Sequence, residues 1–458
     1  MNRFQFSLAL AIALLVGCTP IDTEVPEDPE NSSSLKLPPV HSKQFIDRAT
    51  PVAAPPKPDR PLTVPPDSPD PQVQKQIEQF LNGLASQGFP AENHGVWMQT
   101  EDALLANYQG TKPISAASVT KVATALAALT ILRPEHQFIT EVGIVGKIAD
   151  GVLEGDLVVN SEGDPFIRWE EAIAFGNLLN QLGIQRVTGD LIVNDKFYMN
   201  FCPNSFDPCP LSPGEYLFEG LDERLWTAEV LQQYQKLPPG TPRPQVAIEG
   251  TVRVESQIPE GVKPLIRHYS PPLVEQVKLM NRYSNNMVAE ALAQAVGGAK
   301  VVAQTAAETT GIPPEEIQLV NGSGYAEENR MSPRAAVALF LALQNNFQAY
   351  NLSVADMVAV VGTDEGILDS RSLPAFAVVK SGSLNNVSTI AGALPTQIRG
   401  TVWLAIFNGG NNMEGFRAAQ DALLNDLVKR WGAVSGSPAE LTPITNPIAK
   451  QARTELVQ

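Results

Sequence analysis

Ser118 and Lys121 stand three residues apart in a segment, "SAASVTKVATALAAL" (115–129), that is otherwise almost entirely alanine, valine, leucine and threonine. A helix buried on all sides normally excludes lysine, because an unpaired buried ammonium group is costly to desolvate. Residues three apart on a helix share one face, and a lysine there can lose its proton and act as a general base on the serine. At the N-terminus of the helix, the backbone N–H of Ser118 is free and the helix dipole favours developing negative charge. The pair predicts an activated serine nucleophile, provided that the site opens into a cleft.

This pair alone is weak evidence for catalysis. An S-x-x-K sequence is expected about once or twice by chance in a chain of this length, and a second copy, Ser33 to Lys36, lies in a segment with no helical pattern. The alternative interpretation is structural, with Ser118 as a helix N-cap and Lys121 extending its charged end to the surface.

Two further motifs follow in the chain. Ser284 and Asn286 form an S-x-N sequence between two predicted helices, and Lys380-Ser381-Gly382-Ser383 closes the predicted strand "AFAVVK". Each has a structural alternative, because the first could be a polar turn and Lys380 a lysine that protects a sheet edge from aggregation. Together, S-x-x-K, S-x-N and K-[ST]-G in this order are a much stronger signal, and they form the motif set of β-lactamases and penicillin-binding proteins.

Within that superfamily, residues 75–432 resemble the penicillin-binding proteins of type 4, which are D-alanyl-D-alanine carboxypeptidases and endopeptidases. Those proteins carry extra domains between the first two motifs, and here "DGVLEGDLVVNSEGDP" and "VTGDLIVNDKFY" resemble the start of that insertion. Further on, "NGSGYAEENRMSP" resembles the family segment D-G-S-G-L-S-R-x-N-x-x-[ST]-P, and "GTDEGILDSR" resembles G-x-x-G-T-L-x-x-R. The sequence departs from these patterns in using serine for two threonines of the third motif and in the following positions: Asn321, Ala326, Glu327 and Ile367. These departures put the substrate preference in doubt more than catalysis.

The resemblance implies that Ser118 attacks the carbonyl of the penultimate D-Ala with Lys121 as the base. Backbone N–H groups of Ser118 and Ser383 would form the oxyanion hole, a large contribution in acyl transfer. Ser284 would relay the proton to the leaving D-Ala amine. Water then hydrolyses the acyl-enzyme, and β-lactams act as inhibitors.

The resemblance also implies a substrate-binding strand and a polar contact from the second motif. Lys380, Ser381 and Ser383, with Gly382 between them, would bind the terminal carboxylate of the substrate. Asn286 would bind an amide of the peptidoglycan stem peptide. No cofactor or metal is expected in this mechanism.

The implied fold class is α+β, a β-lactamase/transpeptidase-like core with an antiparallel sheet flanked by helices. Apolar periodicity predicts a helix over 72–88, two short strands in "HGVWMQT" and "ALLANYQ", three consecutive late strands and a terminal helix. The strands can form one sheet with helices around it. A strand pair is predicted in "QVAIEGTVRVES", and the echo of "GDLVVN" in "GDLIVN" could reflect a duplicated β-unit.

The predicted domain organisation has five parts. The core is split around a β-rich insertion, and the whole is preceded by a signal peptide and a Pro-rich linker too poor in apolar residues to fold. The predicted ranges are 1–17 for the signal peptide, 18–72 for the disordered linker, 73–138 and 266–435 for the transpeptidase-like domain, 139–265 for the insertion and 436–458 for a flexible tail.

The N-terminus predicts export. An arginine precedes an apolar run from Phe4 to Val16, too short for a good transmembrane helix and suited to a signal peptide. The run ends in Leu15-Val16-Gly17-Cys18, which resembles a bacterial lipobox, and so predicts a lipid on Cys18 and a location on the periplasmic, extracytoplasmic side of a bacterial membrane. An ordinary secretory signal with an incidental cysteine is the alternative.

Composition excludes some partners. The formal charge is −16, and clustered Lys and Arg that would bind nucleic acid are missing beyond the first residues. The remaining cysteines, Cys202 and Cys209, lie in a Pro-rich loop, where an oxidising compartment makes a disulfide plausible. A zinc site is weakly supported, because the four histidines are scattered along the chain.

Two alternative functions are considered. A β-lactamase or esterase shares the three motifs but needs a base for fast deacylation, and the usual E-x-x-L-N element is matched only imperfectly by Glu316 to Asn321, with the asparagine one place late. A catalytically silent, wall-binding lipoprotein is the other. A decayed site is expected to have lost a hydroxyl or a lysine, and all of them are present.

Overall fold

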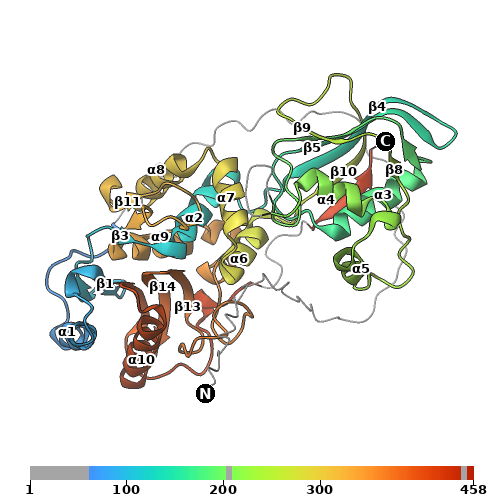
Figure 1. Ribbon diagram of the computed structural model, residues 1–458. Helices are drawn as coiled ribbons and strands as arrows, with labels where there is room; N and C mark the ends of the chain where they lie inside the picture. Colours follow the sequence, from blue (N-terminus) through green and yellow to red (C-terminus); the bar gives the residue numbers. More distant parts are fainter. Residues whose placement is uncertain (1–60, 203–208, 445–450, 458) are drawn as a thin grey trace, which may run out of the picture. The chain divides into compact units, whose positions relative to one another are not determined.

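The computed structural model describes residues 61–202, 209–444 and 451–457. Within this part, two sheets dominate the architecture, one of five strands and one of eight (Figure 1). The predicted lipobox around Cys18 lies outside the described residues. Among the described residues, no helix combines the length and the apolar character needed to cross a membrane.

The five-stranded sheet confirms the predicted assembly of two early and three late strands. Its order is β13-β14-β15-β1-β2, and its neighbours are antiparallel. The strands are β1 (His94–Gln99), β2 (Leu104–Tyr108), β13 (Val378–Leu384), β14 (Val387–Thr396) and β15 (Gly400–Gly409). In β15, Leu404 and Ile406 face one side while Trp403, Ala405 and Phe407 face the other, as the two-residue period of a strand requires.

Helices cover both faces of this sheet. The first face is covered by α1 (Pro71–Ser86) and α10 (Met413–Trp431), whose Ile77, Leu81 and Leu424 pack into the core with Leu404 and Ile406. The second face is covered by α9 (Pro333–Asn346), which contacts β1, β14 and β15. The predicted helix near 72–88 and the terminal helix are therefore both confirmed.

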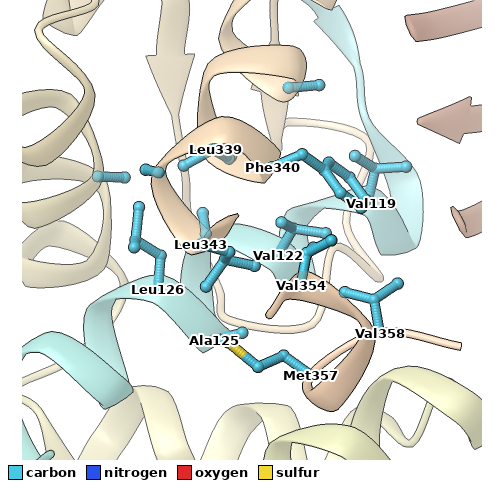
Figure 2. Close-up of a cluster of buried hydrophobic side chains, with 14 of the residues drawn as sticks. Val119, Val122, Ala125, Leu126, Leu339, Phe340, Leu343, Val354, Met357 and Val358 are labelled. Carbon is cyan, nitrogen blue, oxygen red and sulfur yellow. The ribbon is translucent and has the colours of Figure 1, made fainter. Parts of the chain in front are cut away.

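Helix α2 (Thr120–Leu132) lies at the centre of the helical layer and is buried around its whole circumference from Thr120 to Leu129. Alanine and leucine are strong helix formers, and a helix that is apolar all round is stable only when it is enclosed. It contacts α6 (Leu273–Tyr283), α7 (Asn286–Ala295), α8 (Ala299–Thr310) and α9. Figure 2 shows Val122, Ala125 and Leu126 of α2 packed among Leu339, Phe340 and Leu343 of α9 and Val354, Met357 and Val358. Lys121 is thus held on a rigid, fully packed element.

The eight-stranded sheet is built mainly from the segment between the first two motifs. Its strands are β4 (Ile139–Ala149), β5 (Val152–Ser161), β6 (Arg186–Val187), β7 (Leu191–Asn194), β8 (Ala247–Ile248), β9 (Val252–Glu255), β10 (Lys263–Tyr269) and β16 (Arg453–Leu456). Helices α3 (Trp169–Gln181), α4 (Pro213–Gly220) and α5 (Ala228–Tyr234) contribute Phe175, Leu217 and Val230 to its core. The proposed domain limit at 265 falls inside β10.

The echo of "GDLVVN" in "GDLIVN" corresponds to neighbouring strands. Strands β5 and β7 pair in parallel with Leu157 opposite Leu191, which occupy the same position in the two copies. The strand pair predicted in "QVAIEGTVRVES" is wrong as a pair, because β8 pairs with β6 and β9 pairs with β7. Each strand finds its partner among the parallel strands of the sheet instead of folding back on its sequence neighbour.

The predicted flexible tail also needs correction. Residues 453–456 form β16, which pairs antiparallel with β10 and places Glu455 opposite Arg267. The Nδ1 of His268 and the Oγ1 of Thr454 lie 2.8 Å apart in the same strand pair. The tail is polar in sequence, but an exposed sheet edge offers backbone groups that pair with almost any extended segment.

The last residues of the predicted linker are likewise packed. Leu62 and Val64 lie against the helical core, and the N–H of Val64 donates to Oε1 of Gln99. Helix α1 begins at Pro71, with Asp70 as its N-cap accepting from two backbone N–H groups. A few apolar side chains and the buried Gln99 therefore order the described part of the linker. The amino-acid composition of the linker alone does not predict these contacts.

Outside the two large sheets lie a small three-stranded sheet and one cross-link. The small sheet consists of β11 (Ile317–Gln318), β12 (Arg330–Met331) and β3 (Ile114–Ser115), and it ties the segment before Ser118 to the loop that precedes α9. Cys202 and Cys209 are joined by a disulfide bond, the pairing that the sequence suggests.

Candidate active site

Ser118 lies in a single 3-10 turn, Ala117–Val119, directly before α2. Ala117 has a left-handed backbone conformation with φ of 45°, which costs a non-glycine residue about 1–2 kcal/mol. The surroundings hold this turn in place, because Oγ1 of Thr389 in β14 donates to the carbonyl of Ala116 at 2.9 Å. Ser118 is therefore presented on a strained turn that is attached to the sheet.

Lys121 is completely buried and its ammonium group has three acceptors. Its Nζ lies 2.9 Å from Oγ of Ser118, 2.7 Å from Oδ1 of Asn286 and 2.7 Å from the carbonyl oxygen of Ser323. Burial lowers the pKa of Lys121 to about 7, against the opposing effect of the Glu290 carboxylate. A lysine with this pKa, hydrogen-bonded to a serine hydroxyl, can accept the serine proton near neutral pH.

Glu290 and Ser323 surround Lys121 and are candidate site residues that the sequence did not point to. The Glu290 carboxylate accepts the N–H groups of Gly322 and Ser323 at 3.0 and 2.9 Å, which orients the Ser323 carbonyl toward Lys121. Glu290 lies four residues after Asn286 on α7, a spacing that places both on one helix face. That spacing was the signal available in the sequence.

The segment around Ser323 forms a tight turn against the turn that carries Ser118. Gly324 has φ of 79°, and a Cβ on it would lie 1.9 Å from the carbonyl oxygen of Ala117, so glycine is required there. Oδ1 of Asn321 accepts from the N–H of Gly324 and from Nδ2 of Asn329. Asn321, one of the departures from the family pattern, therefore supports the turn as an acceptor.

Ser284 lies at the joint between α6 and α7 in a left-handed conformation, with φ of 53°. Its Oγ accepts a hydrogen bond from Nζ of Lys380 at 2.9 Å, and the same ammonium group donates to the carbonyl of Ser381 at 2.6 Å. Burial lowers the pKa of Lys380 well below its ordinary value, and the charge of Lys121 lowers it further. The S-x-N motif thus contacts both lysines, through Ser284 at Lys380 and through Asn286 at Lys121.

The third motif lies on β13 and runs past Ser118. Gly382 approaches the turn so closely that a Cβ on it would lie 2.7 Å from the backbone nitrogen of Ser118. Oγ of Ser383 accepts from a guanidinium nitrogen of Arg417 at 2.8 Å. Arg417, on α10, was not identified from the sequence.

A cavity of about 200 Å³ opens at these groups. It brings together side chains from all three motifs, and the residues that line it are Ser118, Ser284, Ile367, Arg371, Ser381, Ser383 and Arg417. Ile367 and Arg371 belong to the "GTDEGILDSR" segment. The requirement that the site opens into a cleft is met through Ser118, which lines the cavity, while Lys121 is buried behind it.

This arrangement defines a class of protein. The site combines a serine paired with a buried lysine of lowered pKa, a second serine–lysine pair and an open cavity. It lies on an antiparallel sheet that is flanked by helices. These features are those of a serine hydrolase with the β-lactamase/transpeptidase-like fold. The family model of the D-Ala-D-Ala carboxypeptidase 3 (S13) family matches residues 76–201 and 243–428. The chain belongs to this family.

Individual proteins are similar to this chain in sequence or in fold. D-alanyl-D-alanine carboxypeptidase DacB of Haemophilus influenzae is 22% identical over 415 residues, covering 71% of this chain and 85% of the relative. The structure resembles the predatory endopeptidase Bd3459 of Bdellovibrio bacteriovorus, solved with an immunity protein, with a TM-score of 0.61 at 17% identity over 79% of this chain and 99% of that one. It also resembles penicillin-binding protein 4 of Haemophilus influenzae in complex with a β-lactam, with a TM-score of 0.58 at 20% identity over 76% and 99%.

Family membership establishes the general activity. The protein is a hydrolase of the penicillin-binding type that acts on peptidoglycan, and its substrate implies that it is exported.

Proposed function

We propose that the protein is a serine-type D-Ala-D-Ala carboxypeptidase, with endopeptidase activity on cross-linked stem peptides as a second reaction of the same site. The observation that carries the proposal is the hydrogen bond of 2.9 Å between Nζ of Lys121 and Oγ of Ser118 at the edge of an open cavity. The two types of relative support it, since one is a carboxypeptidase and another is an endopeptidase.

Acylation begins when neutral Lys121 takes the proton of Ser118. The serine oxygen bonds to the carbonyl carbon of the penultimate D-Ala, and the carbonyl oxygen becomes an oxyanion. Backbone N–H groups of Ser118 and Ser383 stabilise that charge, a contribution worth about 10²–10³ in rate for one donor. The close approach of Gly382, the residue before Ser383, to the backbone nitrogen of Ser118 supports this role.

Collapse of the intermediate breaks the peptide bond. The terminal D-Ala leaves as an amine that needs a proton, and Ser284 donates its hydroxyl proton to that amine and recovers one from Lys380. The proton that Lys121 took from Ser118 then passes to Lys380, so that Lys121 is neutral again before hydrolysis. A water molecule then attacks the ester carbonyl, its proton passes to the neutral amine of Lys121, and Ser118 recovers a hydrogen as the ester bond breaks. Asn286 holds Lys121 through its Oδ1, which leaves the amide NH₂ group to bind the stem peptide.

The β-lactamase alternative is less well supported by the structure. Glu316, the only carboxylate of the imperfect E-x-x-L-x-N match, is buried and bound to the guanidinium of Arg334 and the hydroxyl of Ser332. It does not line the cavity. A carboxylate held in this way is a structural ion pair and not a base poised to activate the deacylating water.

We also propose that the exported protein is anchored by a lipid on Cys18. The support is the lipobox-like Leu15-Val16-Gly17-Cys18 at the end of an apolar run.

The activity is tested by mass spectrometry and product analysis. Benzylpenicillin should leave one penicilloyl ester on Ser118, and the protein should release D-Ala from a stem pentapeptide. Ser118→Ala should abolish both, whereas Ser115→Ala, three residues earlier, should retain both. Wild-type protein that forms no adduct and releases no D-Ala would refute the proposal, and fast turnover of nitrocefin would favour the β-lactamase instead.

A further inference from the structure

Arg417 places a guanidinium group at the end of the motif strand, inside the cavity of the nucleophile. It projects from the first turns of α10, which packs against β14, beside β13 (Figure 1). One of its terminal nitrogens donates to Oγ of Ser383, and its side chain is 28% exposed, so it is both fixed and accessible. Arg417 therefore lies beside a hydroxyl that is expected to bind the substrate carboxylate.

The other cations near the nucleophile, Arg371 in the lining of the cavity and the buried Lys380 behind it, are less suited to hold an anion. Arg371 is 4% exposed and is neutralised by Asp421, which receives its Nε and a terminal nitrogen at 3.0 and 2.6 Å. The ammonium group of Lys380 is enclosed between Ser284 and the Ser381 carbonyl, and burial lowers its pKa. A lysine that exchanges its proton during the reaction gives no constant charge to a substrate.

Arg417 keeps its charge throughout. A guanidinium group does not lose its proton in a protein, and its planar fork matches the geometry of a carboxylate. Its acidic neighbour, Glu414, is 77% exposed, and an ion pair of that kind is weak. The Nε of Arg417 is buried and has no hydrogen-bond partner among the described residues, so the group retains donor capacity.

We propose that Arg417 binds the terminal carboxylate of the substrate together with the hydroxyls of Ser381 and Ser383, while Lys380 works with Ser284 in proton transfer. This assignment rests on the proposed function and refines it, because it separates the group that recognises the substrate from the group that moves protons. It makes Arg417 a specificity residue for peptides and β-lactams that carry a free carboxylate.

The test compares benzylpenicillin with its methyl ester, which lacks the negative charge. The Arg417→Gln variant should lose about ten- to a hundredfold in acylation efficiency with benzylpenicillin, the range expected for a lost charge-assisted hydrogen bond. Acylation by the methyl ester should stay within about threefold of wild type under the same principle. Arg417→Lys should fall between wild type and Arg417→Gln with benzylpenicillin, because it keeps the charge and loses the fork.

The matched control is Arg430→Gln, which removes an exposed arginine from the same helix and should change neither reaction. Equal losses with both compounds, or no loss with benzylpenicillin, would overturn the assignment. If Arg417→Gln does not fold, as judged by its thermal midpoint, the same comparison with Arg417→Lys decides. If the wild-type protein reacts with neither compound, the proposed function is overturned and this assignment with it. The wild-type control therefore distinguishes failure of the proposed function from failure of the Arg417 assignment alone.

Discussion

Gly382 and Ser118 approach each other so closely that the position of a Cβ on Gly382 lies 2.7 Å from the backbone nitrogen of Ser118. The two residues are far apart in the chain and meet because β13 runs along the turn that carries the nucleophile. The same Cβ position lies 2.4 Å from Oγ1 of Thr389, which in turn holds the carbonyl of Ala116. Side chains at this point would separate the strand from the turn.

Gly382→Ala should therefore impair acylation more than folding. The added methyl group must displace β13 or the turn, and a shift of about 1 Å at a reacting group costs about a hundredfold in rate. Overpacking should lower stability by about 1–3 kcal/mol. Rates of benzylpenicillin acylation and thermal midpoints measure both effects. Gly83→Ala, on α1 with open space around the new Cβ, is the control and should leave the rate unchanged. An unaltered rate in Gly382→Ala would contradict the close approach.

The pH dependence of acylation should report Lys121. Burial lowers its pKa to about 7, and only the neutral amine can accept the serine proton. The rate should thus rise with pH through about 7 and level off above it, and this is measured with benzylpenicillin between pH 5.5 and 9. A rate that is constant across this range, or that rises only near the ordinary pKa of lysine, would count against Lys121 as the base.

Glu290→Gln provides a directional check on the same profile. The Glu290 carboxylate raises the pKa of Lys121, so its neutralisation should move the midpoint of the profile to lower pH. The new amide still offers one acceptor oxygen to the N–H groups of Gly322 and Ser323, which limits structural damage. A midpoint that moves to higher pH would show that the carboxylate does not act on Lys121 through its charge.

Cys18→Ala should release the protein from the membrane fraction of cells that express it. The reason is that a lipid on this cysteine would be the anchor. The apolar run before Cys18 is suited to a signal peptide and is too short for a good membrane span. Immunoblotting of soluble and membrane fractions decides the matter, with Cys202→Ala as a cysteine control that keeps the anchor. Persistent membrane association of the Cys18→Ala protein would reject the lipid.

The candidate reactive groups and most of the elements around them could be predicted from the sequence. Ser118, Lys121, Ser284, Lys380 and their neighbours were found from residue type, spacing and chain order, because each motif is a local arrangement on one helix, turn or strand. The five strands of the main sheet and its two flanking terminal helices were likewise predicted, since apolar periodicity over a strand or helix is a local property.

The contacts between groups far apart in the chain could not be predicted and became apparent from the fold. The Ser323 carbonyl reaches Lys121 over a separation of 202 residues, and Arg417 reaches Ser383 from another element. Neither contact can be predicted from a sequence motif. Every residue has a backbone carbonyl, and nothing in the residues around Arg417 distinguishes it from the other arginines of the chain. The pairing of β16 with β10 is similar, since backbone hydrogen bonds join strands with little regard to side chains. Short motifs reveal candidate reactive groups, whereas the contacts that bury these groups and shift their pKa values depend on how distant segments pack.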